Sequence, residues 1–211
     1  KGSYGSVYKA RRREGGKVYY SAIKHISIEG SPDYPAEQLV QSLAREVEIS
    51  FQLRGDPHFV GYEDSYFAEK PNRSGYDAFI RMELLTPLTD RMKTGQMSEV
   101  EVVRMGVDIC GALESLEQRN ILHRDIKPEN IFIGSAGEYK LGDFGVARSL
   151  GGTTGGMTIA GTFNYMAPEI YRGGRVNHTA DIYSLGMVLY RMLNAGRAPF
   201  MVLPPAVPSY E

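Results

Sequence analysis

The stretch that decides the fold is residues 121–145. It begins Ile-Leu-His-Arg-Asp-Ile-Lys-Pro-Glu-Asn-Ile-Phe-Ile and ends Tyr-Lys-Leu-Gly-Asp-Phe-Gly. Two short apolar runs, Ile131–Ile133 and Tyr139–Leu141, have the composition of strands, and the small and polar residues between them favour a turn. The stretch therefore predicts a β-hairpin.

Three acid or amide side chains flank this hairpin. Asp125 and Asn130 come just before its first strand, and Asp143 comes just after its second. Because the outer ends of two paired antiparallel strands lie side by side, we expect the three side chains to gather at one end. Carboxylate and amide oxygens suit Mg²⁺, which also takes substrate phosphates as ligands. The hairpin therefore predicts a magnesium site.

The composition of the 211 residues is that of an ordinary globular protein, with 42% hydrophobic and 23% charged residues. The formal net charge of −1 gives no general attraction to nucleic acid or to membrane surfaces. The one cysteine, Cys110, excludes an internal disulfide. It falls in a helical apolar pattern, which favours core packing over chemistry.

No apolar run is long enough to span a membrane, and no signal peptide is visible. These observations predict a cytoplasmic location. The chain begins Lys1-Gly-Ser-Tyr-Gly, inside what looks like a motif and without an initiator Met. We therefore expect a fragment, whose full-length protein could carry a membrane anchor or a sensor domain.

The first part of the chain predicts an α+β lobe. Strand-like runs occupy residues 4–10, 17–26, 59–67 and 78–84, and residues 36–53 repeat apolar side chains with a helical period. Several antiparallel strands with one helix fit this order.

Two glycines, a lysine and a glutamate of this lobe are candidate phosphate-site residues. Gly2 and Gly5 open the first strand, where glycine lets backbone amides approach a phosphate closely; a plain hairpin turn fits them equally well. Lys24 lies inside the second strand, where a lysine is usually an exposed edge charge. Glu46 lies beside the apolar stripe of the helix and could face Lys24, or it and Glu48 could both be solvated.

The second part is mainly helical. Residues 85–90 contain a proline and connect the two parts. Ser98 and Glu101 have the spacing of a capping box at the start of a long helix. Residues 148–161 are rich in Gly and Thr, which favours a loop. Asp181 opens a strongly apolar helix, where an acid can simply cap backbone amides.

In their order along the chain, the motifs resemble those of the eukaryotic-type (Hanks-type) serine/threonine protein kinases. His123-Arg124-Asp125-Ile-Lys127-Pro-Glu-Asn130 is similar to the catalytic loop, and Asp143-Phe144-Gly145 to the metal-binding triplet. Ser21-Ala22-Ile23-Lys24 is similar to the β3 lysine motif. Met166-Ala167-Pro168-Glu169 is similar to the end of the activation segment.

The resemblance implies a two-lobed protein kinase fold of the α+β class, truncated at both ends. Residues 1–85 would form the N-lobe and residues 86–211 an incomplete C-lobe, together one kinase domain. The two glycines near the start would be the last two of the Gly-rich loop. The amino-acid sequence of residues 82–88 and 181–187 looks more like that of the bacterial family members than that of the animal ones.

The resemblance also implies ATP as substrate and Mg²⁺, or Mn²⁺, as cofactor. Asp125 would accept the proton of the acceptor hydroxyl. Asn130 and Asp143 would hold the metal. Lys24 would grip the α- and β-phosphates, with Glu46 as its helix partner. The ATP-binding residues would be Gly2, Gly5, Val7, Ala22, Lys24, Met82, Glu83, Leu85, Phe132 and Asp143.

Two further residues favour Ser or Thr over Tyr as the acceptor. Lys127 would stabilise the transferring phosphate, and Thr162 would lie beside it. The partners would be protein substrates that carry Ser or Thr, with self-phosphorylation in trans as a route to activation. Nucleic acid is not expected as a partner.

Regulation is expected through Arg124, which the family keeps buried near a carboxylate and neutralises with a phosphate. Thr158 is the first candidate for phosphorylation and Thr154 the second. Ser50 stands where the family stacks an apolar side chain, and a polar residue at this position would loosen the active arrangement. The chain also ends before the helices that supply the partner of Glu169. Losing such a buried pair costs roughly 3–5 kcal/mol, so we expect lower stability and activity than in a completed domain.

Two alternatives remain open at this point. The first is a pseudokinase or ATP-binding signalling scaffold, but none of Lys24, Asp125, Asn130 and Asp143 is lost. The second is a small-molecule kinase with a related fold. Those enzymes lack the Ala167-Pro168-Glu169 segment, which builds the peptide-docking floor.

Overall fold

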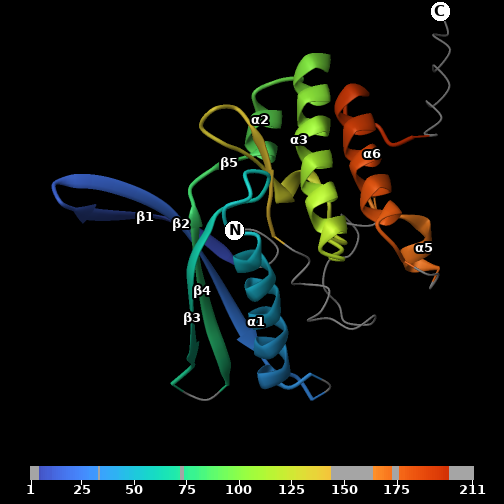
Figure 1. Cartoon of the computed structure of the whole chain (residues 1–211). Coiled ribbons are helices and arrows are strands. Elements are labelled where there is room, and N and C mark those ends of the chain that lie inside the picture. Colours follow the sequence, from blue (N-terminus) through green and yellow to red (C-terminus); the bar gives the residue numbers. More distant parts are fainter. Residues whose placement is uncertain (1–4, 33, 72–73, 144–163, 173–175, 200–211) are drawn as a thin grey trace, which may run out of the picture.

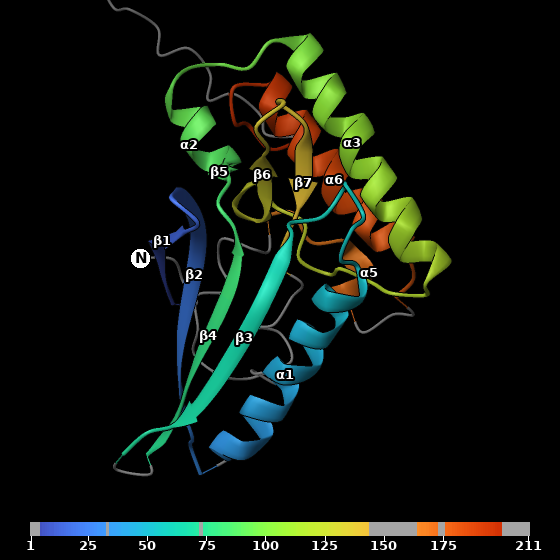
Figure 2. The ribbon, with the colours of Figure 1, turned by 60° about the vertical axis from the view of Figure 1, so that its left-hand side comes forward.

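The computed structural model describes residues 5–32, 34–71, 74–143, 164–172 and 176–199. Its first part is an antiparallel sheet with strand order β1-β2-β4-β3. The strands are β1 (Ser6–Glu14), β2 (Lys17–Glu29), β3 (Tyr62–Glu69) and β4 (Gly75–Glu83). The helix α1 (Ala36–Gln52) packs against β2, β3 and β4 (Figure 2). The predicted α+β lobe is therefore confirmed.

The first two strands are longer than the sequence pattern indicated. They form a continuous hairpin whose two-residue turn consists of Gly15 and Gly16, with φ angles of 54° and 78°. A turn with both central residues at positive φ matches the right-handed twist of the flanking strands, and only glycine adopts it without strain. The turn therefore lets strand pairing run out to Glu14 and Lys17.

The core of this lobe forms where α1 covers the sheet. Leu43 and Val47 from the helix pack against Ile26, Ala78 and Ile80 from the strands, and all five are buried. The helical period that predicted α1 thus corresponds to its buried face.

The second part holds a small sheet and four helices in the described residues. The sheet has the order β5-β6-β7, with β5 (Thr86–Pro87), β6 (Ile131–Ile133) and β7 (Tyr139–Leu141). The helices are α2 (Leu88–Lys93), α3 (Glu99–Gln118), α5 (Pro168–Tyr171) and α6 (Thr179–Leu193). α3 and α6 lie side by side (Figure 1). A single 3₁₀ turn, Pro128–Asn130, precedes β6.

The capping box at the start of α3 is confirmed. The backbone N–H of Glu101 donates to Ser98 Oγ at 3.3 Å, and the backbone N–H of Ser98 donates to Glu101 Oε2 at 2.9 Å. The expectation that Cys110 packs in the core is wrong, because it lies on the exposed side of α3 next to the buried Ile109. None of the described helices combines the length and the apolar character that a membrane crossing needs.

Candidate active site

The β6–β7 hairpin brings the predicted metal ligands together. Ile131 pairs with Leu141 across the ladder, and the backbone N–H of Gly142 donates to the carbonyl of Asn130 at 2.9 Å. Asn130 Nδ2 in turn lies 3.4 Å from the carbonyl oxygen of Asp143. The loop before the hairpin and Asp143 after it therefore meet at one end, as the sequence predicted.

The Asp125 carboxylate is held by two donors. Lys127 Nζ lies 2.8 Å from Asp125 Oδ2, and Asn130 Nδ2 donates to the same oxygen at 3.0 Å. Asn130 Nδ2 also donates to the backbone carbonyl of Asp125 at 2.8 Å. All three residues are buried. Because both contacts fall on Oδ2, the carboxylate is fixed in orientation and Oδ1 is the atom suited to receive a proton.

Lys24 reaches this cluster from β2. Its Nζ lies 2.7 Å from Asp143 Oδ1, so an ion pair joins β2 to the residue that follows the hairpin. Lys24 and Glu46 are each 8% exposed, which makes the solvated-charge interpretation of both wrong. The pairing of Lys24 with Glu46 stays a prediction.

Asp181 is a site residue whose role the sequence did not reveal. Its Oδ2 accepts a hydrogen bond from the His123 backbone N–H and its Oδ1 from that of Arg124, each at 2.8 Å. Arg124 has a φ of 64°, a left-handed conformation that is uncommon outside glycine. Asp181 does cap backbone amides, but these belong to the loop before β6 and not to its own helix. The signal in the sequence was an acid on a strongly apolar helix. In the structure Asp181 is 3% exposed.

His123 links the loop to the hairpin as a neutral ring. Its Nε2 lies 3.1 Å from the carbonyl oxygen of Gly142, and the backbone N–H of Asp125 donates to its Nδ1 at 3.3 Å. Since a carbonyl only accepts, Nε2 carries the proton and Nδ1 accepts. Burial lowers the pKa of His123 below its ordinary value because the charged form loses its hydration.

This lowered pKa predicts a pH dependence of stability. The unfolded chain binds a proton at His123 below pH ~6.5 while the folded chain resists it, so the free energy of unfolding falls as the pH drops below that value. The contribution is at most about 1.4 kcal/mol per pH unit. Urea denaturation between pH 7.5 and 5 should show a flatter pH profile for His123→Gln than for the wild type. His178→Gln is the control, and equal profiles for all three proteins would contradict the prediction.

A buried phenol supports the triplet from β3. The backbone N–H of Asp143 donates to the hydroxyl of Tyr62 at 3.3 Å, and Asp143 has a φ of 53°. Burial raises the pKa of Tyr62, so the hydroxyl stays protonated. The hydroxyl of Ser50 donates to the carbonyl of Glu46 at 3.1 Å. The polar Ser50 expected to loosen the site therefore has a hydrogen-bond acceptor within its own helix.

Removing the Tyr62 hydroxyl should destabilise the protein. In Tyr62→Phe the backbone N–H of Asp143 loses its acceptor, and an unsatisfied buried donor costs about 1–3 kcal/mol. Chemical denaturation measures this loss. Tyr66→Phe is the matched control, because Tyr66 lies on the same strand and is 65% exposed. Equal stabilities for the two variants would refute the role of the hydroxyl.

Four of the predicted ATP-binding residues lie in or against one apolar cluster. Ala22 and Met82 are buried in the N-lobe core, and Leu85 and Phe132 pack against the same cluster. Val7 is instead 62% exposed. A methyl group on Gly5 would lie 2.1 Å from the carbonyl oxygen of His25, and its φ is 134°. Gly5 is therefore required for close packing on β2, whatever its role toward a phosphate.

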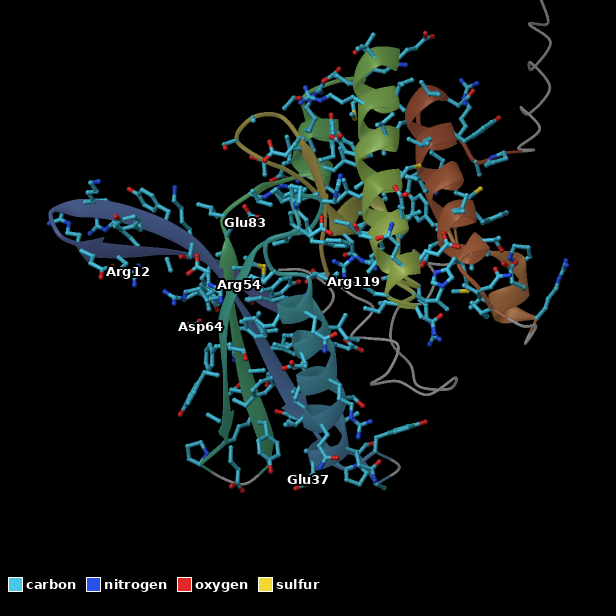
Figure 3. All side chains as sticks on the ribbon, viewed as in Figure 1. Arg12, Glu37, Arg54, Asp64, Glu83 and Arg119 are labelled. Carbon is cyan, nitrogen blue, oxygen red and sulfur yellow. The ribbon has the colours of Figure 1, made fainter. Side chains whose placement is uncertain are left out.

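Glu83 has a side-chain role that the sequence did not predict. Its Oε1 accepts from the backbone N–H of Gly61 at 2.6 Å and lies 2.8 Å from Lys140 Nζ. Lys140 belongs to β7, so Glu83, at the end of β4 (Figure 3), joins the two lobes. Any contact of Glu83 with adenine must then come from its backbone.

The remaining predicted residues divide into two groups. Arg124 is exposed, so the expectation of a buried arginine does not hold. The other positions lie outside the described residues, and they are Gly2, Thr154, Thr158 and Thr162.

Comparison with known proteins agrees with this geometry. The protein kinase domain matches residues 1–203. The chain belongs to the protein kinase family. It is 38% identical over 200 residues to serine/threonine-protein kinase 36 of Pongo abelii, covering 94% of this chain and 14% of that protein. It is 37% identical to serine/threonine-protein kinase fused of Drosophila melanogaster over 200 residues, or 94% of this chain and 23% of that protein.

A third relative is serine/threonine-protein kinase Nek1 of Mus musculus, 32% identical over 230 residues, covering all of this chain and 18% of that protein. The chain thus spans less than a quarter of the length of these relatives. The two-lobed protein kinase fold expected from the sequence is confirmed, and the names of the relatives support a serine/threonine kinase.

Proposed function

We propose that the chain is the catalytic domain of a kinase that transfers the γ-phosphate of ATP to Ser and Thr hydroxyls of proteins. The observation that carries the proposal is the cluster in which Lys24 contacts Asp143 at 2.7 Å and Lys127 contacts Asp125 at 2.8 Å. Phosphoryl transfer depends on positioning and charge neutralisation, and this cluster supplies both.

The residues take separate roles in the transfer. The acceptor hydroxyl oxygen forms a bond to the γ-phosphorus while the bond to the β–γ bridging oxygen breaks, and ADP leaves. Asp125 receives the hydroxyl proton. Lys127 lies beside Asp125 and can neutralise charge on the transferring phosphate. Lys24 can hold the α- and β-phosphates after leaving its contact with Asp143.

The donor set fits a magnesium ion. Asn130 uses its Nδ2 for hydrogen bonds to Asp125, so its amide oxygen is the atom suited to ligate a metal ion. Asp143 adds a carboxylate ligand. Two hard oxygen ligands suit Mg²⁺ or Mn²⁺, which complete their shells with phosphates and water. Such an ion would supply positive charge against the phosphates when bound.

Several finer points belong to the same proposal. We propose residues 1–85 as the N-lobe and residues 86–211 as the C-lobe, and the ion pair of Glu83 with Lys140 would then cross their boundary. Activation is proposed to involve phosphorylation of Thr158, or next Thr154, by a second copy in trans. A cytoplasmic location and bacterial origin stay predictions; the relatives reported above come from animals.

A transfer assay tests the function. The protein is incubated with γ-labelled ATP, Mg²⁺ and peptide mixtures that differ only in Ser, Thr or Tyr at the acceptor position. We expect the wild-type protein to label the Ser and Thr peptides. The Asp143→Asn variant should label none of the peptides. ATP binding without transfer would favour a pseudokinase, and transfer to an aminoglycoside alone would favour a small-molecule kinase. Phosphopeptide mapping of active enzyme should find Thr158 or Thr154 modified; finding neither would reject that site.

A further inference from the structure

A cavity of about 300 Å³ lies in the second part of the chain, outside the cluster of Asp125 and Asp143. It is bounded by residues that follow α2, by Tyr165 and by the C-terminal end of α6 (Figure 2). Its apolar lining includes the buried side chains of Met97 and Met192. Of the described residues that line it, Arg191 alone carries a charge.

The Arg191 side chain is held in one orientation. Its Nε donates to the carbonyl of Gly196 at 3.1 Å, and its guanidinium lies 5.0 Å from the centre of the Tyr165 ring. The backbone N–H of Gly196 donates in turn to the carbonyl of Arg191 at 2.7 Å. Because Nε is already bonded, the two Nη atoms are the donors suited to a further partner. Their planar fork matches the two oxygens of a carboxylate.

The positive charge of Arg191 has no carboxylate partner among the residues that the structure describes. Arg91, which precedes Met92 of the lining, is by contrast paired with Glu101 at 2.9 Å. Residues 144–163, which come before Tyr165 in the chain, contain neither Asp nor Glu. That stretch therefore cannot supply a carboxylate to Arg191, which favours a partner molecule as the source.

The cavity is connected to the proposed reaction site through Glu129. The neighbouring Asn130 donates to Asp125 Oδ2 at 3.0 Å, and the 3₁₀ turn that holds both Glu129 and Asn130 packs against α2. Burial raises the pKa of the Tyr165 phenol, Arg191 lowers this pKa and Glu129 raises it. Both charges therefore lie near the Tyr165 ring, which places the cavity beside the turn.

We propose, on the basis of the transfer function proposed above, that this cavity binds a carboxylate side chain of the protein substrate and that Arg191 thereby selects acidic substrates. An extended peptide advances about 3.3 Å per residue, so a segment with its hydroxyl at Asp125 reaches neighbouring sites with its next few residues. The apolar lining suits the CH₂ groups of a Glu side chain, and Arg191 suits its charge. A basic side chain at the same position is rejected because like charges repel.

Peptide mixtures test the preference. Each mixture has Ser at a fixed place and either Glu or Lys at one other position, from five residues before the Ser to four after it, with the remaining positions mixed. We expect one position, or two adjacent ones, where Glu is labelled roughly tenfold faster than Lys, since contacts between like charges are costly. Equal rates at every position would overturn the inference and leave the transfer function standing. A wild type that labels no mixture would overturn both.

Variants of Arg191 test the residue at the position so found. Arg191→Glu should reverse the ratio, so that Lys is labelled faster than Glu. Arg191→Lys keeps the charge but loses the planar fork, so the ratio should fall and still favour Glu. Each ratio is taken within one protein, which removes differences in folding or in overall rate.

Arg13→Glu is the matched control. It makes the same change of net charge at an exposed arginine of the β1–β2 hairpin, so the ratio should equal that of the wild type. An Arg191→Glu variant that keeps the wild-type preference would overturn the inference. Equal changes in Arg13→Glu and Arg191→Glu would also overturn it, because they would show a response to net charge alone.

A pair of single peptides separates binding from chemistry. One carries Glu at the preferred position, and the other carries Gln, which has the same size without the charge. The Gln peptide should show a raised KM with kcat within about twofold, because Arg191 binds the substrate away from the reacting atoms. A loss confined to kcat would overturn the binding role of the cavity.

Discussion

Asp125→Asn is expected to lower kcat for phosphoryl transfer about 10²–10⁴-fold, the range for loss of a positioned general base. The substitution keeps the shape of the side chain but removes the group that receives the hydroxyl proton. It also changes the partner of Lys127, which now contacts a carboxylate oxygen at 2.8 Å. Because Asp125 does not hold the nucleotide in this proposal, KM for ATP should change little.

Steady-state kinetics with a Ser-containing peptide measure the effect. Asp90→Asn is the control, because Asp90 lies on α2 and pairs with Lys93 at the surface, where such pairs contribute about 0–1 kcal/mol. A kcat for Asp125→Asn within threefold of the control would remove Asp125 from the reaction. Melting curves for both variants separate a chemical defect from a folding defect.

Asp181→Asn is expected to reduce both stability and activity. In the wild type the carboxylate accepts hydrogen bonds from the backbone N–H groups of His123 and Arg124. The new amide places its NH₂ group against one of these two donors. Losing a charge-assisted hydrogen bond and leaving a buried donor unsatisfied costs roughly 2–4 kcal/mol. The left-handed Arg124 backbone depends on this support, so kcat should fall as well.

Urea denaturation gives the stability change, and the transfer assay gives kcat under conditions where the variant is folded. Asp64→Asn is the control, since Asp64 is an exposed acid that binds Arg81 at the surface of the sheet. A stability loss for Asp181→Asn no larger than for Asp64→Asn would contradict the role assigned to Asp181.

Features that depend on neighbouring residues could be predicted from the sequence. The hairpin strands Ile131–Ile133 and Tyr139–Leu141 have the predicted bounds, and Ser98 caps α3 as its spacing indicated. Each rests on local composition or on a contact three residues away. The gathering of Asp125, Asn130 and Asp143 followed because hairpin geometry converts sequence position into spatial position.

Features that depend on distant partners could not be predicted in this way. The bonds from Asp181 cross 57 and 58 residues, and the bond from Tyr62 to Asp143 crosses 81. The contact of Lys24 with Asp143 crosses 119 residues and depends on how the lobes meet. No periodicity or spacing in a single sequence encodes such pairings.

The contacts of Glu83 with Gly61 and Lys140 connect the two lobes at one point, here called the bridge. If one lobe rotates relative to the other about this point, the displacement of any atom grows with the distance of that atom from the bridge. The apolar cluster that contains Ala22, Met82, Leu85 and Phe132 adjoins β4 and β6 close to the bridge and should keep nearly constant dimensions. Atoms farther from the bridge, including those that meet the phosphates, should move the most. In the proposed kinase, the chain would then contact the base of a nucleotide in every arrangement of the two lobes. It would contact the phosphates in only some of these arrangements.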